Sequence, residues 1–198
     1  MPEDPISKGE LTRQAILEAA HALFIEQGYH ATTMRQISER AGLVVGGLYN
    51  HFKSKEEIYS QVLLEYHPYR QIIPILATAS GESLEELVMN ASRLFDAELG
   101  KRPEFMKLIF IELSEFKGAH ASLLFSTIFP QVVPLLKRFQ EQHGELRDVP
   151  LPVVLLSFMG TFFAYFLSHY FILASDFPGL QENSIEQYMD VFLHGIIR

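Results

Sequence analysis

The chain has 198 residues, of which 48% are hydrophobic and 12% aromatic, which is enough to bury a sizeable core and excludes disorder of the whole chain. It contains no cysteine, which excludes disulfide bonds and thiolate chemistry and suits a reducing cytoplasm. Its formal net charge of −8 argues against a broadly basic surface.

The first predicted element is a helix over residues 7–28. The residues before it have neither the basic start nor the apolar run of a signal peptide, so we expect a cytoplasmic protein. Ser7 and Glu10 predict a capping box at the start of the helix, and Gly28 ends it. The residues expected to face the rest of a small domain keep helical spacing: Ile16, Ala19, Ala20, Leu23 and Phe24.

Residues 33–55 contain two short helices joined by a tight turn. Thr33, with a glutamine three residues later, predicts a capping box at the start of the first helix, and Gly42 supplies the left-handed residue that commonly ends one. Leu48 and Phe52, four residues apart, give the second helix a buried face. This pattern is typical of a helix-turn-helix, in which the second helix enters the major groove of DNA.

The first 55 residues resemble the N-terminal domain of the tetracycline-repressor (TetR) family. The resemblance is carried by residues 15–33, Ile37, Ala41-Gly42, Gly46 and residues 48–55. Beyond Leu64, only the length and the helical character agree with the family. The resemblance implies an all-α, dimeric transcriptional regulator that usually represses and is released from DNA by a small molecule. It implies a helix-turn-helix DNA-binding domain over residues 1–54 and a helical effector-binding and dimerisation domain over residues 55–198.

The resemblance also implies a set of DNA contacts. Tyr49, His51 and Lys55 match family positions that bind phosphates, and a phenol, an imidazole and an ammonium are suitable donors. Thr33 can add its hydroxyl at the start of its helix, and Arg35 can reach a phosphate or a base edge. The expected recognition face consists of Val44, Val45, Gly46, Gly47 and Asn50.

This recognition face departs from the family pattern, which usually has serine near position 44 and a polar or small residue at position 47. Val44 cannot cap a helix, and the two glycines each cost about 1 kcal/mol relative to alanine. We infer that the valines contact thymine methyl groups, that the glycines let the backbone approach DNA closely, and that Asn50 adds a polar contact. The alternative is a helix-turn-helix used only for packing.

The distribution of charge bears on the same question. Through residue 55, six Lys and Arg residues balance six Asp and Glu residues, so the excess of acid lies in the rest of the chain. A local set of donors can still bind DNA, but we expect a modest non-specific affinity that depends strongly on salt. The alternative is a helical small-molecule-binding protein whose DNA-binding module is weak or vestigial.

A connecting helix follows, capped by Ser54. Because proline ends or kinks a helix, Pro68 and Pro74 predict a break between Tyr66 and Ile75. This helix is the only covalent link between the DNA module and the remainder, and in the family its pendulum-like motion changes the spacing of the two DNA modules. The alternative is a loop without a mechanical role. Further helices are predicted over residues 83–100, 103–118, 122–142 and 184–197.

Between Asp148 and Asp176 the chain has no charged residue, a length that fits a transmembrane helix. No basic cluster flanks it, however, and its small residues share one face, so we expect a helix over about 152–175 that packs closely on another helix and does not span a membrane. The TetR resemblance implies pairing through the last two long helices. The predicted interface consists of Val153, Ser157, Gly160, Ala164, Ser168, Ile185, Tyr188, Met189 and Phe192.

The opposite face of that helix is aromatic and would meet apolar residues of the preceding helices. Such a cluster can enclose a cavity for an apolar or aromatic, neutral or cationic effector; the alternative is a solid core. The polar side chains nearby in sequence are Glu112, Glu115, His120 and His169. The predicted ligand-binding residues are Phe105, Ile109, Phe110, Phe125, Phe129, Met159, Phe162 and Phe166.

No motif supports an enzyme. The sequence has no Gly-x-Ser-x-Gly nucleophile elbow, no His-Glu-x-x-His zinc helix and no glycine-rich phosphate loop. We therefore expect no catalytic residues, no metal and no cofactor. The expected partners are a double-stranded, palindromic DNA operator, a small-molecule effector and a second copy of the chain.

Overall fold

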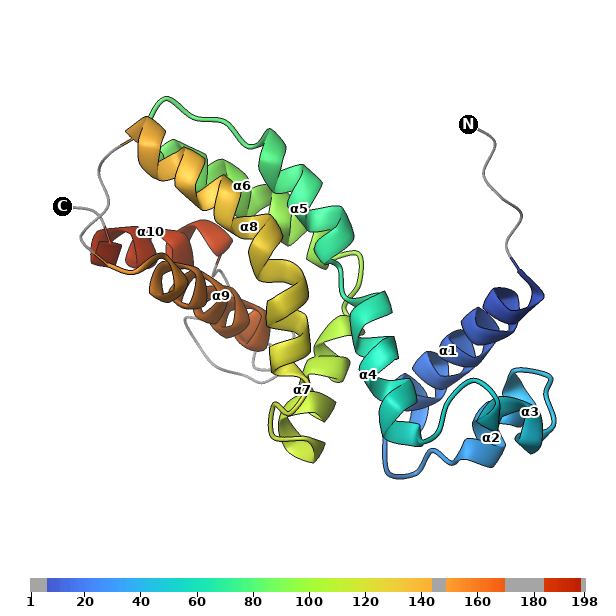
Figure 1. The fold of residues 1–198 in the computed structure, drawn as a ribbon. Coiled ribbons are helices and arrows are strands. Elements are labelled where there is room, and N and C mark those ends of the chain that lie inside the picture. Colours follow the sequence, from blue (N-terminus) through green and yellow to red (C-terminus); the bar gives the residue numbers. More distant parts are fainter. Residues whose placement is uncertain (1–6, 144–148, 170–183, 197–198) are drawn as a thin grey trace. The chain divides into compact units, whose positions relative to one another are not determined.

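The computed structural model describes residues 7–143, 149–169 and 184–196, and the regular elements among them are helices (Figure 1). The chain forms two compact units: an N-terminal unit of residues 1–67 and 104–124, and a C-terminal unit of residues 68–103 and 125–198. This division differs from the predicted boundary between residues 54 and 55, because helix α4 (Lys55–Tyr66) packs against α1 within the N-terminal unit.

Besides α4, the N-terminal unit contains α1 (Lys8–Gln27), α2 (Met34–Arg40), α3 (Val45–Tyr49) and α7 (Phe105–Glu115). The predicted starts of α1 and α2 are confirmed. Ser7 Oγ accepts from the N–H of Glu10, whose carboxylate accepts from the N–H of Ser7 at 2.8 Å. Thr33 forms the same capping box at α2. Gly28 and Gly42, which follow α1 and α2, have φ of 83° and 70°, a region that glycine enters without strain.

A shared aromatic core explains why α4 and α7 belong to this unit. Tyr59 of α4 is fully buried, and its hydroxyl donates to the carbonyl oxygen of Leu108 on α7 at 2.8 Å. Its ring lies 5.7 Å from the ring of Phe24 on α1. Burial raises the pKa of the Tyr59 phenol, so the hydroxyl remains a donor. Burying one such aromatic side chain contributes about 1.5–3 kcal/mol.

The C-terminal unit contains α5 (Tyr69–Thr78), α6 (Leu84–Leu99), α9 (Leu151–Leu167), α10 (Ile185–Ile196) and all but the first turn of α8 (Ala121–His143). The predicted break is confirmed: α4 ends at Tyr66, and α5 begins at Tyr69 with Pro68 as its N-cap residue. Helix α8 contains two prolines, Pro130 and Pro134.

Helices α6, α9 and α10 pack together through aromatic rings. The ring of Phe162 on α9 lies 4.3 Å from Phe95 on α6, and Phe158 lies 5.8 Å from Phe192 on α10. Within the described part of the chain, no helix is both long and apolar enough to cross a membrane. Residues 170–175 of the helix predicted over 152–175 lie outside the described residues.

Candidate DNA-binding surface

Helix α3 is anchored on one side and bare on the other. Leu48 is completely buried and Phe52, just after the helix, is 2% exposed. By contrast, Val44 is 79% exposed and Tyr49 is 51% exposed. Val45 is also exposed. Because α3 has only five residues, its stability comes from the packing of its buried side rather than from helix propensity.

The outer side of α3 lacks the features that strengthen a helix. Val44 is the N-cap residue, and it makes no side-chain capping bond, as its residue type predicts. Among the residues that the structure describes, and leaving aside the backbone of α3 itself, a β carbon on Gly46 would meet no atom within 4 Å, and one on Gly47 would meet only Val44 Cγ2, at 3.8 Å. The packing of the N-terminal unit therefore requires neither glycine.

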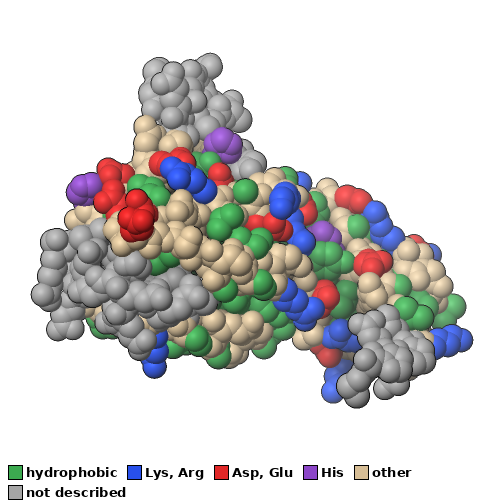
Figure 2. All heavy atoms as spheres, turned by 90° about the horizontal axis from the view of Figure 1, so that it is seen from above, with side chains coloured by type: hydrophobic (Ala, Val, Ile, Leu, Met, Phe, Trp, Pro, Cys, Tyr) green, Lys and Arg blue, Asp and Glu red, His purple; other side chains and the backbone are tan. Residues whose placement is uncertain are grey.

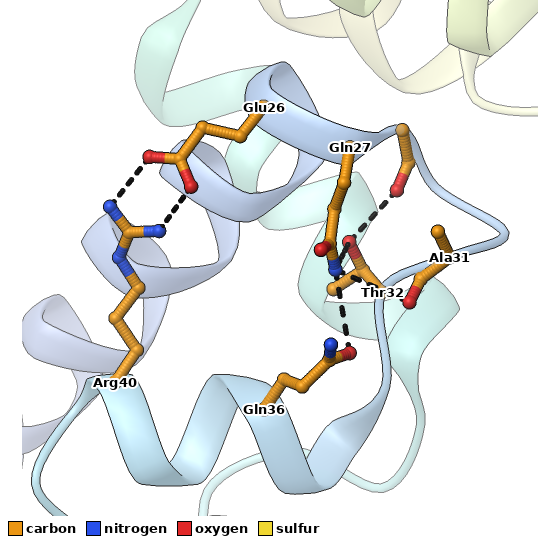
Figure 3. A network of polar contacts seen from close by, with 7 residues as sticks. Glu26, Gln27, Ala31, Thr32, Gln36 and Arg40 are labelled. Atoms are coloured by element: carbon orange, nitrogen blue, oxygen red, sulfur yellow. Dashed lines mark hydrogen bonds and ion pairs between the residues drawn. The ribbon is translucent and has the colours of Figure 1, made fainter.

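The corner between α1 and α2 is held by a polar network (Figure 3). The side-chain amide of Gln27 donates to the carbonyl oxygen of Ala31 and to Thr32 Oγ1, both at 3.2 Å. The Thr32 hydroxyl donates to the carbonyl oxygen of Gly28 at 2.8 Å. These bonds fix the start of α2, where Thr33 is exposed with its hydroxyl in the capping box.

The arginines of α2 form ion pairs on the surface. Arg35 Nε lies 2.7 Å from Glu39 Oε1, and both side chains are largely exposed. Arg40 makes two bonds to the Glu26 carboxylate, at 2.5 and 2.7 Å (Figure 3). Donation from Arg40 lowers the pKa of Glu26. Exposed pairs of this kind are weak, so a DNA phosphate can compete with Glu39 for Arg35.

Lys55 is held within the N-terminal unit by two hydrogen bonds. Its ammonium donates to the carbonyl oxygens of Tyr29 and Thr32 at 2.6 and 2.7 Å, and it lies 4.1 Å from the centroid of the Tyr29 ring. Burial lowers the pKa of Lys55. The side chain thus holds the α1–α2 corner with two of the three donors of its ammonium. That Lys55 contacts a DNA phosphate stays a prediction.

Lys53 is the cation that sequence reasoning overlooked. It is exposed and forms no ion pair with any residue that the structure describes. Asn50 is also exposed, and His51 is half-buried. On the face shown in Figure 2, the described Lys and Arg side chains are scattered among acidic ones rather than gathered in one broad patch. Within the N-terminal unit, the exposed candidates are thus Thr33, Arg35, Val44, Val45, Gly46, Tyr49, Asn50 and Lys53.

The predicted ligand-binding residues are divided between the two units, with Phe105, Ile109 and Phe110 in the N-terminal unit and the others in the C-terminal unit. Phe162 and Phe166 are each 2% exposed and fill the core of the C-terminal unit, which favours the solid-core alternative for these two rings. Phe125 is 44% exposed and stacks on Phe129 at 4.6 Å, and Met159 is exposed as well.

The polar residues named with them have internal partners. Glu112 is buried and accepts from the backbone N–H of His120 at 2.7 Å, and Glu115 pairs with His30. His169 stacks on Tyr165 with ring centroids 5.5 Å apart. In the described ranges, no group of His, Asp and Glu side chains is arranged to hold a metal ion. The C-terminal unit also has an open surface groove of about 620 Å³, lined by Ser83, Glu85, Glu86, Met89, Asn90 and Arg93.

The predicted dimer residues fall into two groups. Val153, Ser157, Gly160 and Ala164 lie exposed on α9, whereas Ser168, just after this helix, is buried. The α10 residues do not: Ile185, Met189 and Phe192 are buried in the core of their own unit, and the half-buried Tyr188 donates to Ser168 Oγ at 2.8 Å. The structure corrects this part of the prediction, because α10 uses its apolar side against α6 and α9. On α10 it is Val191, 75% exposed, that faces outward.

Comparison with known proteins adds independent findings. A family model described as bacterial regulatory proteins of the tetR family matches residues 16–62. The HTH-type transcriptional repressor KstR2 of Mycolicibacterium smegmatis is 38% identical over 93 residues, which are 44% of this chain and 43% of KstR2. The HTH-type transcriptional regulator YvkB of Bacillus subtilis is 26% identical over 194 residues, which are 93% of this chain and 97% of YvkB. The alignments with KstR2 proteins thus span less than half of those relatives.

Solved structures extend the likeness of fold to the C-terminal unit. GusR of Salmonella enterica, at 19% identity, matches with a TM-score of 0.74 over 98% of this chain and 99% of GusR. The family match covers most of α1, all of α2 and α3 and most of α4, which include the helix-turn-helix. Taken with the anchored α3 and its bare outer side, these findings show that residues 16–62 are similar to bacterial regulatory proteins of the tetR family and that the fold of the whole chain resembles that of GusR.

Proposed function

We propose that the chain is a DNA-binding transcriptional regulator whose helix α3 enters the major groove. The observation that carries this proposal is the contrast between the two sides of α3. Leu48 anchors it in the core, while Val44 and Tyr49 are exposed on the other side, over 79% and 51% of their surface. An anchored helix with a bare outer side is the arrangement of a recognition helix.

Phosphate contacts would come from residues around α3. Thr33 and Arg35 flank it from α2, and Tyr49, His51 and Lys53 lie at its end or just beyond it. Lys55 supports them indirectly by holding the α1–α2 corner. With so few free cations, the interaction should be weak on random DNA and should depend on a matching sequence.

The proposal includes a homodimer that represses from a palindromic operator. The exposed side of α9 offers apolar and small residues, among them Leu156, Gly160 and Ala164, and Val191 adds an apolar residue on α10. Two copies paired there would place two α3 helices in successive major grooves, roughly 34–36 Å apart. Repression is proposed because KstR2 carries the name of a repressor.

Release by a small apolar or aromatic molecule is the last part of the proposal. The exposed stack of Phe125 and Phe129 gives such a molecule a first contact. Within the N-terminal unit, Phe116 at the end of α7 lies 4.8 Å from the Tyr29 ring and 4.6 Å from the Tyr59 ring. A shift of α7 would therefore move the α1–α2 corner. The effector must bind the conformation that does not bind DNA more tightly than the one that does.

The test is selection of random duplex DNA by the purified full-length protein at moderate salt. We expect an inverted repeat to be enriched. Val45→Asp places a negative charge on the outer side of α3 without touching the core, so it should fold normally and enrich nothing. If the wild type is folded and dimeric but also enriches nothing, the proposed DNA-binding function is wrong. The alternative, a helical small-molecule-binding protein with a vestigial DNA module, then replaces it.

A further inference from the structure

The outer side of α3 combines two features that the N-terminal unit does not need. Val44 is exposed over 79% of its surface, although an exposed valine gains nothing from burial and cannot cap the helix. Gly46 and Gly47 both have ordinary negative φ, and a β carbon at either position would fit without a clash. Alanine would stabilise this short helix better than either glycine.

The two glycines and the exposed valine therefore do not stabilise the free protein. We look for their role in the molecule that this side of α3 binds. Glycine lets another molecule approach the backbone more closely than any other residue allows. Next to the two glycines, Val44 and Val45 place methyl groups where that molecule would lie.

The absence of charged side chains on α3 also bears on which base it can recognise. Guanine is commonly recognised through two hydrogen bonds from one arginine or lysine, and α3 carries no charged residue. Arg35 pairs with Glu39 and Lys55 donates to two carbonyl oxygens, while the exposed Lys53 lies beyond the end of α3. Thymine is the base that presents a methyl group in the major groove.

We propose that α3 recognises thymine methyl groups through Val44 and Val45, at a separation that the bare backbone of Gly46 and Gly47 permits. The inference rests on the proposed function and defines the class of operator: half-sites with thymine at the steps that face α3. The two glycines are then specificity residues, and their weak helix is the consequence of close approach.

The first experiment removes one methyl group at a time from the selected duplex. Each thymine of a half-site is replaced by deoxyuridine, which keeps every hydrogen bond of the base pair. At contacted steps the affinity should fall about fourfold per methyl group. Val44→Ala and Val45→Ala should weaken binding to the unmodified duplex, and with either variant the deoxyuridine that removes the partner methyl should have no further effect.

The second experiment tests the close approach. Gly46→Ala and Gly47→Ala should raise Tm by roughly 2–4 °C and lower the affinity for the selected duplex on the order of tenfold. Gly9→Ala is the matched control, because Gly9 is also an exposed glycine in the first turn of a helix, and among the described residues its β carbon would meet only Ser7 Oγ, at 3.8 Å. It should raise Tm and leave the affinity unchanged.

The outcomes separate this inference from the proposed function. If a duplex is selected but deoxyuridine has no effect at any half-site thymine, the methyl contacts are refuted while DNA binding stands. If both α3 glycine variants bind the duplex as the wild type does, the close approach is refuted. If no duplex is selected, the proposed function fails and takes the inference with it.

Discussion

At the scale of single residues, two lysines only two positions apart have opposite surroundings. Lys55 donates to the carbonyl oxygens of Tyr29 and Thr32, whereas Lys53 is exposed. Lys55→Met should destabilise the fold by about 1–3 kcal/mol, because two carbonyl groups at the corner lose their donor. Lys53→Ala should leave the stability unchanged and make the slope of log K against log salt shallower by about 0.9. Urea unfolding measures the stability of both variants, and a salt titration of DNA binding measures their slopes. If Lys55→Met instead keeps its stability and has the shallower salt slope, Lys55 contacts DNA.

His67 predicts an acid sensitivity. Burial lowers its pKa from 6.5 to about 4. Between these values the unfolded chain binds the proton and the folded chain does not, so stability falls as the pH decreases through this window. The loss is roughly 3 kcal/mol over the whole window. Urea unfolding between pH 7 and pH 4 should show a steeper loss for the wild type than for His67→Gln, and equal slopes would exclude His67 as the cause.

At the scale of elements, α3 is held by packing while its own start is uncapped. Val44→Ser supplies the missing cap, so it should stabilise the protein by about 0.5–1 kcal/mol while weakening DNA binding through the lost methyl contact. Val45→Ser is the matched control, because it removes a valine one position later, where no cap forms. It should weaken binding without raising Tm. A Val44→Ser protein that gains both stability and affinity would contradict the role given to Val44.

At the scale of the whole molecule, the proposed dimer depends on the exposed side of α9. Among the described residues outside the backbone of α9, a β carbon on Gly160 would meet no atom within 4 Å, so Gly160→Leu should leave each copy folded. It should drive two copies apart, because a larger side chain blocks close helix approach. Sedimentation velocity should find a monomer, and DNA affinity should fall with the loss of the second α3. Glu85→Leu, an exposed change on α6, serves as the control and should stay dimeric. A dimeric Gly160→Leu protein would place the interface elsewhere.

The sequence by itself determined the elements that depend on neighbours in the chain. The capping boxes at Ser7 and Thr33, the glycine after α2 and the break at Pro68 are local, since each follows from residues within a few positions. The uncapped start at Val44 was predictable for the same reason. Because the helix-turn-helix is built from such local signals, its position and its outer side were predictable as well.

Only the tertiary structure decided the properties that depend on distant parts of the chain. The carbonyl groups that engage Lys55 lie 23 and 26 residues away, and the bond from Tyr59 that holds α7 spans 49 residues. Periodicity gave α10 an apolar side but not its partner, and Met189 proved to be buried against its own unit. The physical reason is that an apolar side is equally suited to a core and to an interface until its neighbours are known.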